Sequence, residues 1–228
     1  RNLVVCKSAG NDRNDCDPAD STDCDGVLGA DGQRYDVIPT WGISKNVITV
    51  GATNDTDGIA SFSSSGPADD GRIKPDIVAN GVSVYSTWAG GVTLDNCGTG
   101  TDYCSIQGTS MSTPVVAGAT GLLFERYRQV YGGIAPTPDI VKALLVNSAR
   151  DLGRPGPDYL FGHGLLDALG AAQLIDAGPV RIVTESVAQG ALDTWLIAVP
   201  AGTPELRVTL CWNDVAGATN SANPDLVN

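Results

Sequence analysis

Three short apolar runs, free of charge and rich in β-branched residues, most strongly constrain how this chain can fold. They cover 3–6, 47–50 and 77–79, and loops rich in Gly, Ser and Asp separate them. A strand that is apolar along its whole length, without alternation, is typical of a parallel sheet covered on both faces. We therefore expect these runs to form buried strands.

Three helices are expected after these strands. The stretch 112–127 is small or apolar over its first three turns, which suits a helix packed deep in the core. Pro114 is expected in the first turn of that helix, where its missing N–H has no intrahelical partner. A second helix is expected over 138–149, with Thr137 as its N-cap, and a third from about 164 to 177.

The pattern changes in the last part of the chain. Strand-like segments cover 180–187, 194–199 and 206–212, turns containing Gly or Pro separate them, and helical patterns disappear. Mixed strands and helices followed by strands alone indicate an α/β domain over 1–178 and the start of an all-β module over 179–228.

The charge balance and the histidine count argue against several function classes. The chain has 14 Lys and Arg against 26 Asp and Glu, a formal net charge of −12, which argues against a nucleic-acid partner. No apolar run reaches the roughly 18 residues that a membrane span needs. His163 is the only histidine, so sites that need two imidazoles from this chain, most zinc sites among them, are disfavoured.

Six cysteines predict an oxidising compartment and therefore secretion. Cys16–Cys24 and Cys97–Cys104 each bracket a loop without apolar periodicity, where we expect short disulfides. Cys6 and Cys211 lie in apolar runs and are either buried thiols or partners of each other. Zinc is the competing use of the cysteines, but no Cys-x2-Cys pair occurs. No signal sequence precedes the first strand-like run, so we expect a mature or processed polypeptide.

Aspartates cluster in the loop after the first strand, at Asp12, Asp15, Asp17, Asp20, Asp23 and Asp25. Short loops of this kind either form solvated turns or supply the oxygen ligands that calcium takes. A structural calcium site is therefore a candidate use of this loop.

A serine at the start of the expected buried helix is the first candidate for chemistry. In Gly108-Thr109-Ser110 two small residues precede it, and the free N–H groups of a helix N-terminus can stabilise a developing oxyanion. Asn11 follows the first strand, at the edge where a parallel sheet binds ligands, and its amide can donate to an oxyanion. The competing interpretations are a serine that only caps a helix and an asparagine that only forms a turn.

These segments resemble the subtilases, the subtilisin-like serine endopeptidases. The sequence GTSMSTPVVAG at 108–118 is similar to the nucleophile motif of that family, and SAGN at 8–11 is similar to its oxyanion motif. Further family segments are matched, in order, at 46–52, 60–66 and 74–79. The resemblance covers about residues 2–178 and implies a mostly parallel sheet with helices on both faces. The remainder resembles the β-barrel module that some large secreted subtilases carry.

The resemblance also implies roles for individual residues. Ser110 would attack the peptide carbonyl to form an acyl-enzyme, and its N–H would form the oxyanion hole together with Asn11. Ser8, Ala9 and Gly10 would line the substrate pocket beside the scissile bond, with Gly108 and Thr109 also contacting the substrate. A protein or peptide is the implied substrate, and no cofactor is needed for the chemistry.

The general base is missing from the chain. In subtilases the aspartate and the histidine precede the serine, but only Arg1–Ser8 lies before the oxyanion motif. His163 matches the variable position of a Gly-x-Gly segment of the family, which has a structural and not a catalytic role. We therefore expect the Asp and the His to come from an N-terminal portion outside this chain.

Two other function classes compete with this interpretation. A catalytically inactive subtilase remnant, acting as a binding module, would not need to keep both Ser110 and Asn11. An esterase of the α/β-hydrolase type would need Gly-x-Ser-x-Gly, and Ser112 stands where the last glycine of that motif belongs.

Overall fold

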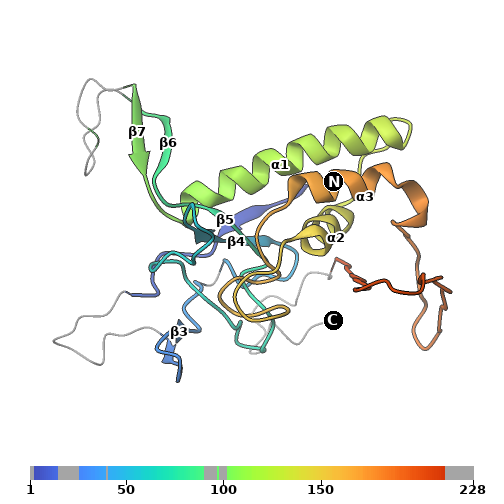
Figure 1. The fold of residues 1–228 in the computed structure, drawn as a ribbon, viewed down its shortest axis with the longest axis horizontal. Helices are drawn as coiled ribbons and strands as arrows, with labels where there is room; N and C mark the ends of the chain where they lie inside the picture. Colours follow the sequence, from blue (N-terminus) through green and yellow to red (C-terminus); the bar gives the residue numbers. More distant parts are fainter. Residues whose placement is uncertain (1–2, 15–25, 40, 90–96, 98–101, 214–228) are drawn as a thin grey trace.

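The computed structural model describes residues 3–14, 26–39, 41–89, 97 and 102–213, and its centre is a parallel sheet. In spatial order the strands are β1 (Cys6–Ser8), β4 (Ile48–Thr53) and β5 (Ile77–Asn80). The runs predicted at 47–50 and 77–79 form buried parallel strands (Figure 1), and β4 is buried at every position. Of the run predicted at 3–6, only Cys6 lies in a strand, and β1 is half-buried, so the prediction of a buried strand there was wrong. The first strand begins later than predicted because Cys6 lies opposite Ile48, where β4 begins, and Leu3 remains 70% exposed.

Two short antiparallel pairs lie outside this sheet. One pairs β2 (Val27–Leu28) with β3 (Arg34–Tyr35), and the other pairs β6 (Val84–Thr87) with β7 (Tyr103–Ile106). These four strands were not predicted, because strands this short have too few residues to show an apolar period.

The longest helix, α1 (Thr109–Val130), crosses the sheet and contacts all three of its strands. It begins before the predicted start, so the prediction for Pro114 was wrong: this proline lies beyond the first turn. Proline there leaves the Ser110 carbonyl without its usual helical donor. Beside it, the hydroxyls of Ser112 and Thr113 donate to the Thr109 carbonyl, at 2.9 and 2.7 Å, and reinforce the start of the helix.

The second helix, α2 (Pro138–Ser148), begins as predicted, although the Thr137 side chain makes no capping hydrogen bond. The third, α3 (Ala168–Asp176), begins later than predicted and is followed by the short 3-10 helix η1 (Gly178–Val180). The reason is that residues 164–166 pair with β5 instead: Val78 N–H donates to the Gly164 carbonyl at 3.0 Å.

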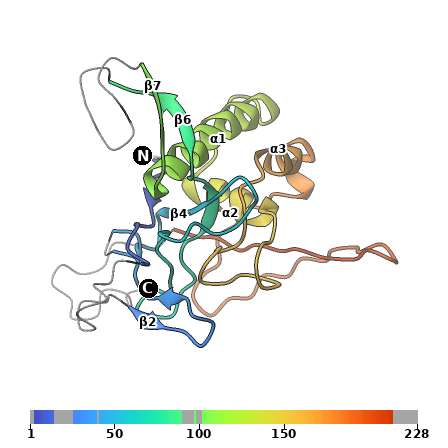
Figure 2. The same ribbon diagram turned by 60° about the vertical axis from the view of Figure 1, so that its left-hand side comes forward.

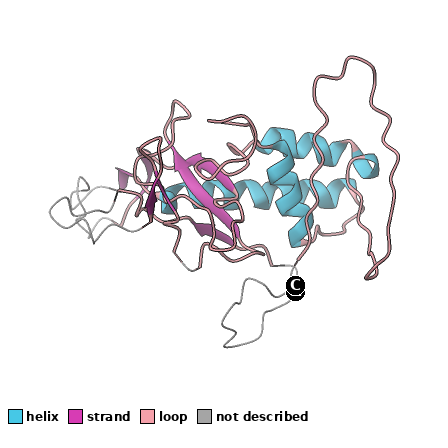
Figure 3. Cartoon of the chain, turned by 90° about the horizontal axis from the view of Figure 1, so that it is seen from below, coloured by secondary structure: helices cyan, strands magenta, loops and turns pink. Residues whose placement is uncertain are grey.

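The two faces of the sheet are covered differently. Ile48, Val50, Ile77 and Ala79 pack with the buried apolar side chains of α1, α2 and α3. Figure 3 shows these three helices grouped together. On the other face, Thr49 donates to the Gly42 carbonyl, within a loop. Helices were expected on both faces. Within the described residues they cover one face, because the described parts of the connections between the parallel strands contain loops and the short β2–β3 pair but no helix.

One side of α1 has no cover among the described residues. On this side Val115 and Leu122 are exposed, and a side chain added at Gly118 or Gly121 would meet nothing within 4 Å. The sequence has no charged residue from Gly108 to Phe124, so this exposed side is apolar as well as the buried one. A helix that is apolar all round is normally buried all round.

The segment 181–213 follows η1 as an extended chain without a strand in its described residues, so the predicted all-β module is not confirmed there. Its apolar side chains are largely exposed, Leu196 at 97% and Leu192 at 88%. A strand needs a partner edge, and no described strand pairs with this segment. It is held near α2, where a guanidinium nitrogen of Arg207 donates to the Ala149 carbonyl at 2.7 Å.

No helix in the described ranges is both long enough and apolar enough to cross a membrane.

A buried ionic cluster lies at the amino end of β5. The Asp76 carboxylate accepts from Lys74 Nζ at 2.6 Å, from Lys142 Nζ at 2.8 Å and from the Thr49 N–H at 2.7 Å. Burial lowers the pKa of Lys74 to about 8, against the raising effect of the adjacent carboxylate. Burial raises the pKa of Asp76, but the two lysines outweigh it and hold that pKa below its usual value. The cluster links β4, β5 and α2.

Removing the central charge of this cluster is expected to destabilise the fold. Asp76→Asn would leave the buried ammonium of Lys74 and the half-buried one of Lys142 without a carboxylate, which costs about 3–5 kcal/mol of unfolding free energy. Denaturant titration would measure the loss. Asp176→Asn, which breaks the exposed ion pair with Arg126, is the matched control and should change little. Equal effects of the two substitutions would contradict the proposed importance of the cluster.

Candidate active site

The N-terminus of α1 is fixed to the carboxyl end of the sheet by two glycines. Gly108 N–H donates to the Gly81 carbonyl at 2.8 Å, and Gly81 N–H donates to the Thr53 carbonyl at 2.9 Å. A Cβ at Gly81 would lie 2.7 Å from the Gly108 carbonyl oxygen and 2.8 Å from the Ala52 Cβ. Gly108 itself has φ of 150°, which L side chains rarely adopt. Only glycine lets the helix start approach the sheet this closely.

Asn11 is bound directly to the same helix start. Its Oδ1 accepts from the Thr109 N–H at 2.9 Å and from the Thr109 hydroxyl at 3.0 Å. The Thr109 hydroxyl in turn accepts from the Gly10 N–H at 3.2 Å. These bonds orient the carboxamide, because both use the oxygen and leave the Nδ2 group available as a donor.

Two possible hydrogen-bond donors lie close to Gly108: a Cβ at that glycine would lie 3.4 Å from Asn11 Nδ2 and 3.7 Å from the Ser110 nitrogen. Ser110 is the second residue of α1, so its N–H belongs to the first turn and has no intrahelical acceptor. Asn11 and Ser110 are both exposed, whereas Thr109 between them is buried. Free donors at the positive end of a helix of 22 residues can stabilise an anion that forms at this point.

The predicted substrate-pocket residues have different surroundings. Ala9 is fully buried and its N–H donates to the Val50 carbonyl at 2.9 Å, while Ser8 is half-buried. Gly10 has φ of 110°, and a Cβ there would lie 2.7 Å from both the Ser64 Oγ and an Asp12 carboxylate oxygen. Ser8 and Gly10 therefore lie along the edge next to Asn11, and Ala9 anchors that edge to β4.

The role of Thr109 differs from the substrate contact that was predicted for it. The threonine holds Asn11 through both its N–H and its hydroxyl. The only signal available was a hydroxyl residue directly before the serine. Gly81 was missed too, because its importance comes from a contact between segments far apart in the sequence.

His163 lies at the other end of β5 from Ser110. Its N–H donates to the Asp76 carbonyl at 3.1 Å, whereas α1 is bound at Gly81. Five residues of extended chain separate these two points by roughly 16 Å. Burial lowers the pKa of His163, although the nearby Asp76 acts in the opposite direction. Within the described residues, no side chain is hydrogen-bonded to the Ser110 hydroxyl.

The cysteine predictions have mixed outcomes. The Cys97–Cys104 disulfide is present, with the two Cα atoms 5.6 Å apart. Cys6 and Cys211 are free, half-buried thiols. Cys16 and Cys24 lie outside the described residues, as does most of the aspartate-rich loop. Elsewhere in the described chain, no group of three or more His, Cys, Asp or Glu side chains could hold a metal ion.

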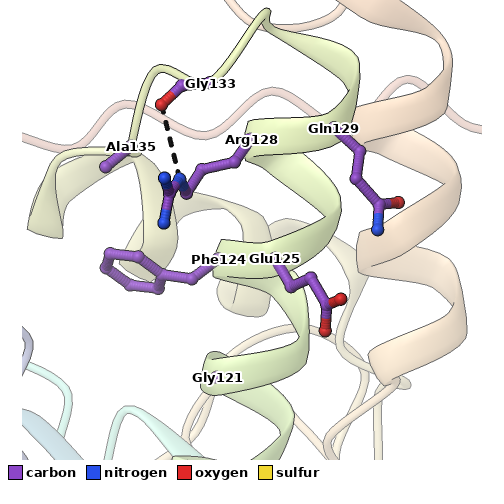
Figure 4. A pocket seen from close by; sticks show the side chains of 7 residues that line it. All are labelled: Gly121, Phe124, Glu125, Arg128, Gln129, Gly133 and Ala135. Carbon is purple, nitrogen blue, oxygen red and sulfur yellow. Dashed lines mark hydrogen bonds between the residues drawn. The ribbon is translucent and has the colours of Figure 1, made fainter.

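A groove beside the second half of α1 is a separate feature. Phe124 and Arg128 line it, and Arg128 Nε donates to the Gly133 carbonyl at 3.4 Å (Figure 4). Arg128 lies 18 residues beyond Ser110 on the helix, which corresponds to about 27 Å. This groove is therefore not part of the candidate site.

Comparisons with known proteins agree with the motifs. A family model described as the subtilase family matches residues 1–164. Serine protease AprX of Bacillus subtilis is 34% identical over 177 residues, which cover 73% of this chain and 34% of that protein. Pyrolysin of Pyrococcus furiosus is 39% identical over 128 residues, covering 52% of this chain and 8% of that protein. The chain thus spans about a third or less of the length of these relatives.

A solved structure has a similar fold. The crystal structure of a lanthipeptide protease aligns with a TM-score of 0.55 and 24% sequence identity, and covers 76% of this chain and 51% of that chain. At this level of identity the likeness concerns the fold alone.

The close glycine contact yields a stability prediction. Gly81→Ala would force its new Cβ against the Gly108 carbonyl oxygen and the Ala52 Cβ. We expect a loss of about 1–3 kcal/mol, as for overpacking in a core, measurable by denaturant unfolding. Ser83→Ala, at an exposed position two residues away, is the control. If both variants unfold at the same midpoint as the parent, the contact is not a tight constraint.

Proposed function

This chain belongs to the subtilase family, and on that premise we propose that it supplies the nucleophile and the oxyanion hole of a secreted serine endopeptidase. The observation that carries the proposal is the pair of hydrogen bonds from Thr109 to Asn11 Oδ1. They bring together two segments about a hundred residues apart and leave a serine hydroxyl and two donors at one exposed point. A serine that merely capped a helix would not need an oriented carboxamide beside it.

The chemistry then follows from the geometry. The Ser110 Oγ attacks the carbonyl carbon of a peptide bond, and the negative charge moves to the carbonyl oxygen. The Ser110 N–H and Asn11 Nδ2 donate to that oxygen, so they bind the tetrahedral state more strongly than the neutral substrate. Collapse of this state expels the amine and leaves an acyl-enzyme, which water hydrolyses.

A general base has to take the serine proton and return it to the leaving amine. His163 lies beside the amino end of β5, whereas Ser110 lies beside its carboxyl end, so His163 is too far from the serine hydroxyl to do so. We propose that the histidine, and the aspartate that orients it, belong to an N-terminal portion of the same protease that is not among these 228 residues. That portion is the partner of this chain in the active enzyme, and proteins or peptides are the substrate.

Other parts of the proposal rest on composition and resemblance. The Cys97–Cys104 disulfide supports an extracellular location, since such bonds persist in oxidising compartments. The aspartate-rich loop stays a candidate for structural calcium, with no role in the chemistry. Residues 1–178 would belong to the catalytic domain, and 179–228 would begin a β module.

Active-site labelling tests the nucleophile. In the assembled protease, a fluorophosphonate should modify Ser110, because only an activated serine reacts readily with such a reagent. Peptide mapping by mass spectrometry would locate the adduct, and Ser110→Ala should abolish it, whereas Ser112→Ala should not. Absence of any adduct on Ser110 in a fully assembled sample would instead favour an inactive remnant that acts by binding.

The oxyanion role of Asn11 has its own test. Asn11→Asp keeps an oxygen that can accept both Thr109 bonds but removes the Nδ2 donor. We expect kcat to fall by a factor of about 10² to 10³ while KM changes little, as when one oxyanion donor is lost. Asn14→Asp, the same change at a nearby exposed position, is the control. A similar fall in both variants would show that added charge, and not the lost donor, is responsible.

A further inference from the structure

The ribbon formed by β6 and β7 leads directly into the candidate site. β7 ends at Ile106, four residues before Ser110, and Gly108 in between is fixed to Gly81. The ribbon stands out from the body of the molecule in both Figure 1 and Figure 2. Its position is therefore tied to that of the nucleophile.

One face of this ribbon is aromatic and exposed. The register pairs Tyr85 with Ser105 and Thr87 with Tyr103, so these four side chains share a face, which we term the aromatic face. Tyr85 is 70% exposed and Tyr103 is 53% exposed. Their rings stack with centroids 5.7 Å apart and planes 18° apart. Neither hydroxyl is hydrogen-bonded to a described residue.

The opposite face of the ribbon is anchored. Cys104 lies on it, is 8% exposed and forms the disulfide with Cys97. The ribbon is extended beyond β6 by the Trp88 N–H, which donates to the Asp102 carbonyl at 2.7 Å. The disulfide thus restrains the ribbon that carries the aromatic face, so little conformational entropy of the ribbon would be lost on binding.

We propose that the aromatic face binds an extended segment of a protein substrate several residues away from the scissile bond, an inference that rests on the proposed function. Tyr103 lies seven residues before Ser110, at most about 23 Å along an extended chain, so the contacted residue is up to seven positions from the cleaved bond. Stacked tyrosines offer flat apolar area with little loss of side-chain entropy.

An extended polypeptide fits the ribbon better than other occupants do. Each strand of the ribbon pairs only with the other within the described residues, so an outer edge with free backbone groups runs beside the aromatic face. Such an edge can take up one more strand. The four residues of the face carry no charge, so recognition would depend on stacking and backbone pairing and not on acidic or basic side chains. The ribbon leads directly into the segment that carries Ser110. A polypeptide substrate bound at Ser110 can therefore extend as far as the aromatic face.

The test compares two substrates of different length in the assembled protease. One is a short chromogenic peptide that covers only the cleavage sequence, and the other extends the same sequence by eight residues on each side. Tyr85→Ser combined with Tyr103→Ser should lower kcat/KM for the long peptide about tenfold, mainly through KM. The short peptide should be cleaved as by the parent. Tyr85→Phe with Tyr103→Phe, which keeps both rings, is the matched control.

Binding measurements separate this inference from the proposed function. In a Ser110→Ala background, fluorescence anisotropy of the labelled long peptide should show the same tenfold weakening on loss of the two rings. Weaker binding would support the inference whether or not the parent cleaves the short peptide. Failure of the parent to cleave the short peptide would count against the proposed function alone. Equal losses on both substrates, or unchanged binding of the long peptide, would overturn the inference. So would a parent that dimerises through this face and becomes monomeric in the double variant, as measured by sedimentation.

Discussion

The close approach of Gly81 and Gly108 is the contact on which the rest of the site depends. It lets the first turn of α1 rest on the carboxyl end of the sheet, where Asn11 emerges from β1. Without that proximity Thr109 could not bind the carboxamide, and the Ser110 N–H would face a different direction. The same contact fixes the ribbon of β6 and β7, because the chain passes from β7 through Gly108 into the helix. Because Gly81 and Gly108 lack side chains, the start of α1, the Asn11 segment and the β6–β7 ribbon can lie close together.

The two ends of the sheet carry different kinds of polar group. At the amino end of β5, Asp76 and Lys74 are buried, Lys142 is half-buried, and the three side chains are paired with one another, so their charges contribute to holding strands and a helix together. At the carboxyl end, the polar groups of Asn11 and Ser110 are exposed and partly unengaged. This division is what a parallel sheet favours, since binding residues collect outside the carboxyl ends of its strands. His163 lies at the amino end of β5, where its N–H donates to the Asp76 carbonyl.

Much of this could be predicted from the sequence, for reasons that differ between elements. The strands at 47–50 and 77–79 were predictable because continuous apolar runs have few alternatives, and the start of α2 because Pro138 marks it. The start of α3 could not be predicted, because residues 164–166 form backbone hydrogen bonds with β5 instead of extending the helix. The Ser110 and Asn11 segments could be identified by motif, but the hydrogen bonds of Thr109 join residues 98 apart, and no local pattern encodes such a contact. The β strands predicted after residue 179 lack a partner edge among the described residues.

The uncovered side of α1 has a consequence for the behaviour of the polypeptide in solution. An exposed apolar surface, such as the one around Val115 and Leu122, favours contact with another apolar surface. Polypeptides that carry such a surface are the ones that chaperones retain and that precipitate when concentrated. Covering this side of α1 would therefore remove the largest uncharged stretch of the helix, 108–124, from contact with water.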